Sequence, residues 1–190
     1  FFTHIMTTSN HRPFTYPDGR IDIPSPGGRA GSMKYTDYAI GRFLDAARSK
    51  PWFNETLFIF VADHCASAAG RTRLPVEGFH IPLILYAPAL LKPGVDRQVS
   101  SQLDIAPTIL DLLGAPGEKT FFGHSLFKVQ GREPRAFIGN YEDLGYYKHD
   151  FLTVLKPRKE VESYRIDPKT FAATPAPVDP ELLREAIAYY

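Results

Sequence analysis

The stretch Thr56-Leu57-Phe58-Ile59-Phe60-Val61-Ala62-Asp63-His64-Cys65 decides how the rest of the chain is interpreted. Nearly continuous apolar, β-prone sequence over 56–62 leads directly to an acid and an imidazole. A run without polar alternation is typical of a strand buried on both faces, as in a parallel sheet covered by helices. In open α/β sheets, ligands bind beside the carboxyl ends of the strands. The sequence therefore indicates a site at Asp63 and His64, with an ordinary polar loop as the alternative.

Length and composition restrict the class of protein. The chain has 190 residues, of which 44% are hydrophobic and 23% charged, as expected for one globular domain with a small appendage. A net charge of +1 gives no broad basic surface that would favour nucleic acid. No apolar run approaches the ~20 residues that span a membrane. Because residues 1–6 already have the character of a strand interior, we expect the chain to be part of a longer protein.

The chain before the deciding stretch has the pattern of a strand, a loop and a helix. Residues 1–8 are predicted to form a first buried strand, and a long polar loop follows. Ser32 can cap a helix that runs to about Ser49. Strand, helix and strand in this order indicate a crossover connection between parallel strands. His11 then lies at the same sheet edge as Asp63, and a solvated loop histidine is the alternative.

The loop after Asp63 carries three further candidates for binding an oxyanion. Arg71 and Arg73 could bind a phosphate or a sulfate, because the planar guanidinium matches the oxygens of both groups. A pair of solvated surface arginines is the alternative. His80 precedes the next predicted strand, 81–87, so it reaches the site only if the loop folds back.

In the second half of the chain, the pattern of apolar and polar residues changes at about residue 131. Asp104 can cap a second helix, with Pro107 in its first turn and Gly114 at its end. Partially alternating segments then indicate an antiparallel β meander. These segments are 136–141, 146–154 and 161–166, and a proline-containing linker at 174–177 and a final helix at 180–190 follow.

Four motifs, taken in order, resemble the sulfatase branch of the alkaline phosphatase superfamily, closest to the lipoteichoic acid synthase and phosphoglycerol transferase group. The motifs are Ser9-Asn10-His11-Arg12-Pro13-Phe14, Asp63-His64, His80-Ile81-Pro82-Leu83-Ile84-Leu85-Tyr86 and Ser101-Gln102-Leu103-Asp104-Ile105-Ala106-Pro107-Thr108. The resemblance implies an α/β fold with a mostly parallel, alkaline phosphatase-like sheet flanked by helices. Residues 1–130 would be the C-terminal part of the catalytic domain. Residues 131–190 would be a small antiparallel β subdomain with a terminal helix.

The resemblance also implies a metal-dependent hydrolase or transferase that acts on phosphate or sulfate esters. One divalent metal ion, manganese or zinc with magnesium or calcium as alternatives, would bind Asp63 and His64. His11 would be a catalytic residue that contacts the transferring group. Arg71, Arg73 and His80 would bind the substrate.

The nucleophile and a further acidic ligand are implied to lie before Phe1. We therefore expect the fragment alone to be inactive and to hold metal weakly, since a stable site takes three or four ligands. The family more often has glycine after Asp-His, where this chain has Cys65. We interpret Cys65 as a small buried thiol and not as the nucleophile.

The implied substrate is a lipid head group or a glycan that carries the ester. The implied location is the extracytoplasmic face of the membrane or the periplasm, with the parent protein anchored through segments outside this sequence. The alternative is a non-catalytic module that binds a polyanionic glycan or a protein partner, in which the Asp-His pair is incidental. An intact nucleophile and acidic ligand upstream would argue against that alternative, and their loss would favour it.

Overall fold

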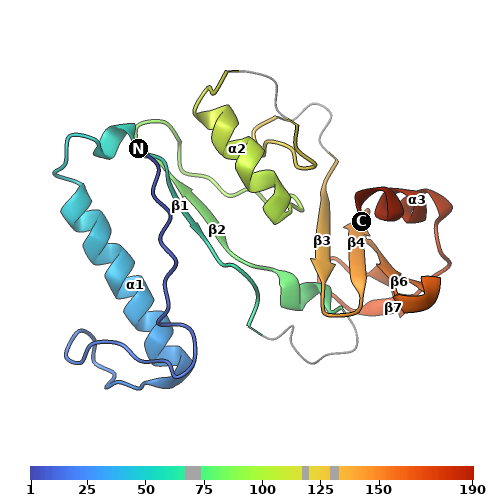
Figure 1. The fold of residues 1–190 in the computed structure, drawn as a ribbon, viewed down its shortest axis with the longest axis horizontal. Helices are drawn as coiled ribbons and strands as arrows, with labels where there is room; N and C mark the ends of the chain where they lie inside the picture. The colour runs from blue at the N-terminus through green and yellow to red at the C-terminus, as the bar shows by residue number, and fades with distance from the viewer. Residues whose placement is uncertain (67–73, 117–119, 129–132) are drawn as a thin grey trace. The chain divides into compact units, whose positions relative to one another are not determined.

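The fold comes from a computed structural model that describes residues 1–66, 74–116, 120–128 and 133–190 (Figure 1). The chain divides into two compact units. The first comprises Phe1–Phe58 and Leu85–Lys92, and the second comprises Ile59–Ile84 and Pro93–Tyr190. Among the described residues, no helix combines the length and the apolar character needed to cross a bilayer.

Helix α1, Gly28–Ala47, is the main element of the first unit (Figure 1). Its first turn lies against Tyr16, whose buried hydroxyl is 3.2 Å from the carbonyl oxygens of both Ile23 and Pro24. A Cβ at Gly27 or Gly31 would collide with that hydroxyl. The helix can therefore begin close to the tyrosine ring only because these positions have no side chain.

The predicted start of this helix at Ser32 is wrong. Ser32 lies inside the helix, is fully buried, and its hydroxyl donates to the carbonyl of Arg29 at 2.9 Å. Serine is a frequent cap, but the close approach of Tyr16 to the glycines before it places the helix start earlier in the chain.

Residues 1–8 also differ from the prediction, because neither sheet of the described chain includes them. Phe1 and Phe2 are 90% and 86% exposed. An apolar run becomes a strand only when a neighbouring strand satisfies its backbone N–H and C=O groups. The parallel crossover inferred from this segment is therefore absent from the described residues.

Strands β1, Phe58–Val61, and β2, Leu83–Tyr86, form a two-stranded sheet at the positions predicted for strands. The N–H of Ala62 donates to the carbonyl of Pro82 at 3.4 Å. The residue after β1 thus lies beside the residue before β2, so the two strands run antiparallel. Val61 and Ile84 are 42% and 56% exposed. The predicted burial of the 56–62 strand on both faces is therefore wrong for β1. Its neighbour β2 runs antiparallel, because an apolar run does not encode the direction of the strand beside it.

The second unit contains a five-stranded antiparallel sheet in the order β3-β4-β5-β6-β7 (Figure 1). The strands are β3 (Arg135–Gly139), β4 (Leu144–Lys148), β5 (Phe151–Leu155), β6 (Val161–Ile166) and β7 (Ala173–Pro175). The predicted meander is confirmed, but its middle segment is two strands. They are joined at His149 and Asp150, whose φ values of 51° and 62° are typical of a tight hairpin turn. β7 occupies part of the predicted linker.

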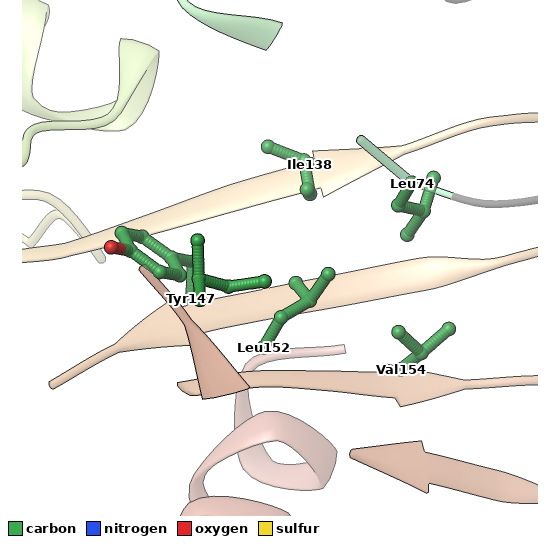
Figure 2. Packing of buried hydrophobic residues seen from close by; sticks show 6 residues of the cluster. Leu74, Ile138, Tyr147, Leu152 and Val154 are labelled. Carbon is green, nitrogen blue, oxygen red and sulfur yellow. The ribbon is translucent and has the colours of Figure 1, made fainter. Parts of the chain in front are cut away.

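Consecutive residues of this sheet face opposite sides and build two separate cores. Tyr147 of β4 packs with Leu152, Val154 and Ile138 on one side, together with Leu74 (Figure 2). Tyr146 packs on the other side against helix α3, Pro180–Tyr189, whose inward residues are Leu182 and Ala186. The predicted terminal helix is confirmed. The side chain of Asp179 caps it by accepting from the backbone N–H groups of Glu181 and Leu182.

Candidate metal-binding site

Asp63 and His64 lie just beyond the end of β1, and their side chains are 74% and 75% exposed. Oδ2 of Asp63 is 3.5 Å from Nε2 of His64. The other carboxylate oxygen, Oδ1, accepts the backbone N–H of His64 at 2.9 Å. Nδ1 of the imidazole is 2.8 Å from the carbonyl oxygen of Cys65. Each side chain is thus fixed by a local backbone group, and their remaining polar atoms face one another.

The contact with Cys65 determines which imidazole nitrogen can bind a metal. A carbonyl oxygen only accepts hydrogen bonds, so Nδ1 is the donor in this contact and Nε2 is the ring nitrogen that is left to bind a metal. Metal-binding histidines commonly use their second nitrogen in this way, which fixes both the tautomer and the ring orientation.

The donor atoms have the spacing that one ion requires. Two ligand atoms that each lie ~2.1 Å from an ion are ~3.4 Å apart at a tetrahedral angle. The separation of 3.5 Å between Oδ2 of Asp63 and Nε2 of His64 is close to this value. A carboxylate and an imidazole suit zinc and manganese. These two residues therefore fit a divalent ion as two of its ligands.

Two ligands do not complete a site. Within the four described ranges, no group of three or more His, Cys, Asp or Glu side chains gathers closely enough to hold an ion. Cys65 contributes its carbonyl to His64, and its thiol is free and half-buried. The prediction that Cys65 is not the nucleophile stays a prediction.

Gln102 is a residue of this site that the sequence interpretation missed. It is the first residue of the short helix η3, Gln102–Asp104, and lies 39 positions after Asp63 in the chain. Its Nε2 donates to the carbonyl of Asp63 at 2.9 Å and lies 3.2 Å from the carbonyl of Ala62. The available signal was its position within the Ser101–Thr108 motif, two positions before Asp104, the residue expected to cap a helix.

The segment that carries Gln102 is held by a buried ion pair. The side chains of Asp104 and Arg135 are 1% and 3% exposed, and Nη1 of Arg135 lies 3.1 and 3.2 Å from the two carboxylate oxygens. The same oxygens accept the backbone N–H groups of Ser101, at 2.9 Å, and His124, at 2.8 Å. Asp104 occupies the N-cap position of helix α2, Ile105–Leu112, as predicted, but its side chain makes no capping hydrogen bond to that helix. The side chain instead completes a capping box with Ser101 for η3.

Of the other predicted site residues, the structure describes His11 and His80. His11 belongs to the first unit, is exposed, and has its Nδ1 2.9 Å from the carbonyl of Arg12. His80 ends the short helix η2, Val76–Phe79, and is exposed. Arg71 and Arg73 lie outside the described residues.

Comparison with known proteins identifies the class to which this fold and site belong. A solved structure of a protein in the alkaline phosphatase superfamily from Vibrio parahaemolyticus matches with a TM-score of 0.87 and 34% identity. The match covers 96% of this chain and 45% of that one. The predicted alkaline phosphatase-like α/β fold is confirmed. The family model for sulfatases matches residues 1–115, so the chain belongs to the sulfatase family.

Curated relatives come from both groups named by the sequence resemblance. Human arylsulfatase A is 26% identical over 182 residues, which is 80% of this chain and 36% of that protein. Lipoteichoic acid synthase 1 of Bacillus subtilis is 23% identical over 158 residues, which is 72% of this chain and 25% of that protein. The chain thus spans well under half the length of these relatives.

Proposed function

We propose that this chain is part of a metal-dependent enzyme that hydrolyses or transfers sulfate or phosphate esters. The observation that carries the proposal is the pairing of Oδ2 of Asp63 with Nε2 of His64 at 3.5 Å, with Nδ1 of His64 fixed by a carbonyl. The ion, manganese or zinc, would polarise the transferring group and lower the pKa of the attacking hydroxyl. Asp63 and His64 would hold it by one oxygen and one nitrogen.

The remaining candidates would act on the substrate and not on the ion. His11 would contact the transferring group and stabilise the charge that develops on it. Arg71 and Arg73 would bind the oxyanion through their forked N–H groups, and His80 would bind a more distant part of the ester. The alcohol part of the ester would be a lipid head group or a glycan.

We propose further that the nucleophile and the remaining metal ligands come from outside these residues. Asp63 and His64 are two ligands, and a stable site takes three or four. The chain alone would then be inactive and would hold metal weakly. Residues 1–130 would belong to the catalytic domain and residues 131–190 to a C-terminal subdomain. A location outside the cytoplasm, with membrane anchoring by other segments, is proposed from the likeness to lipoteichoic acid synthases.

The test measures metal and activity together in the complete gene product. Asp63→Asn keeps the shape of the side chain and removes its charge, and Asp37→Asn makes the same chemical change at an exposed carboxylate of α1 in the first unit. We expect Asp63→Asn to lower bound metal, measured by elemental mass spectrometry after dialysis, while Asp37→Asn leaves it unchanged. Hydrolysis of an aryl sulfate and of an aryl phosphodiester, assayed side by side, distinguishes the two substrate classes.

The alternative function predicts a different result. If the protein is a non-catalytic module that binds a polyanionic glycan or a protein partner, Asp63→Asn leaves the metal content unchanged and neither ester is cleaved. That outcome would overturn the proposal. Loss of metal together with loss of cleavage of one ester class would support it.

A further inference from the structure

A single side-chain amide connects the Ser101–Thr108 motif to the backbone of a proposed metal ligand. Nε2 of Gln102 lies 2.9 Å from the carbonyl oxygen of Asp63 and 3.2 Å from that of Ala62. These carbonyls belong to two successive peptide groups at the point where β1 ends. Their orientation sets the backbone torsions of Asp63 and, with them, the directions of its carboxylate and of the following imidazole.

The donor itself is held rigidly. Gln102 begins η3, whose first turn is closed by the reciprocal capping of Ser101 and Asp104. The Asp104 carboxylate is in turn buried against Arg135 and accepts the N–H of His124. The amide of Gln102 therefore projects from a turn that a fully buried charge pair fixes in place.

We propose that Gln102 is a positioning residue that orients Asp63 and His64 for metal binding, an inference that rests on the proposed role of those two residues. Asp63 and His64 are both highly exposed and follow a four-residue strand, so side-chain packing does little to fix them. The two amide contacts fix the backbone instead. Removing an outer-shell partner of a metal ligand commonly lowers metal affinity by about 10–100-fold.

The test replaces the donor with an isosteric group that cannot donate. Gln102→Glu places a carboxylate opposite two carbonyl oxygens, which repels them and leaves both without a donor. Gln98→Glu is the matched control, because it adds the same charge at an exposed glutamine four positions earlier in the same segment. Gln102→His is the rescue variant, since its Nε2–H lies about as far from the backbone as the glutamine amide.

Two readouts separate positioning from a merely structural role. The affinity of the complete gene product for Mn²⁺ is measured by the electron paramagnetic resonance signal of free Mn²⁺, and the melting temperature is measured in EDTA. We expect Gln102→Glu to weaken Mn²⁺ binding by about 10-fold or more, Gln98→Glu to leave it unchanged, and Gln102→His to restore most of it. The melting temperature in EDTA should change little.

Each other outcome overturns one specific statement. Unchanged Mn²⁺ affinity in Gln102→Glu, when Asp63→Asn abolishes binding, removes the positioning role and leaves the metal site intact. A lower melting temperature in EDTA with unchanged affinity assigns Gln102 a structural role only. Unchanged affinity in both Gln102→Glu and Asp63→Asn overturns the proposed metal site itself.

Discussion

Replacing Asp104 with asparagine should be among the most destabilising conservative changes in the second unit. The side chains of Asp104 and Arg135 are 1% and 3% exposed, and the carboxylate also accepts the N–H groups of Ser101 and His124. Asparagine preserves the shape but leaves the guanidinium of Arg135 buried without a counter-charge. Removing one partner of a buried pair costs about 3–5 kcal/mol.

The assay is hydrogen exchange of the backbone amides in β4 and β5, in the complete gene product. A loss of 3 kcal/mol accelerates exchange through global unfolding about 150-fold, since 1.4 kcal/mol is about a factor of ten. Trp52, the single tryptophan of these 190 residues, belongs to the first unit and not to this sheet. Exchange at the amides of β4 and β5 reports on the sheet itself.

Two comparisons make the prediction refutable. Lys156→Met breaks a 2.8 Å pair with Glu162 whose side chains are 27% and 42% exposed, and it should cost far less, because solvent-exposed ion pairs contribute little to stability. The double variant Asp104→Asn/Arg135→Met removes both buried charges and should be less destabilised than the sum of the two single variants. If Asp104→Asn costs no more than Lys156→Met, or if the two single effects simply add, the ion pair does not stabilise this unit.

Two further changes test packing and titration. Gly31→Ala brings a Cβ against the Tyr16 hydroxyl, and this overpacking should cost about 1–3 kcal/mol, partly offset by the roughly 1 kcal/mol that alanine gains over glycine in a helix. Trp52 fluorescence during urea unfolding measures the change in unfolding free energy. If removing the hydroxyl with Tyr16→Phe does not restore stability to Gly31→Ala, the proposed clash is contradicted. Burial, followed by the charge of Asp150, raises the pKa of Tyr147 from 10.0 to about 12. The unfolded chain therefore loses this proton first, so the stability contribution is complete below about pH 10 and is lost as the pH rises towards 12. Tyr147→Phe should reduce the dependence of the unfolding free energy on pH over this range. An unchanged slope would refute the assignment.

Local elements were predictable where the residues of a single segment determine its structure. The final helix has an acidic cap at Asp179, proline in its first turn and an apolar stripe, and it forms as predicted. The meander follows from alternation and turn residues in the same way. Asp63 and His64 lie at the end of a strand, as the apolar run before them indicates.

Pairing between distant segments was not predictable, because it depends on the residues and the backbone direction of the other segment. Residues 1–8 have the composition of a strand but belong to neither sheet of the described chain, and β1 lies beside an antiparallel neighbour. Gln102 was missed for the same reason. Glutamine has no strong local preference, and its function here lies in the carbonyls of residues 62 and 63, about 40 positions away. His11, Arg71, Arg73 and His80 stay predictions.

The Arg135–Asp104 pair has a consequence for where the protein can be shortened. Arg135 is the first residue of β3, so a truncation that retained the sulfatase match over 1–115 but ended before β3 would remove it. Asp104 would then lose its counter-charge, and a cut before His124 would remove that backbone donor as well, at the turn from which Gln102 reaches Asp63. A boundary drawn at the edge of the sulfatase match would therefore disturb a residue well inside it, and the smallest stable version of this chain must include the antiparallel sheet.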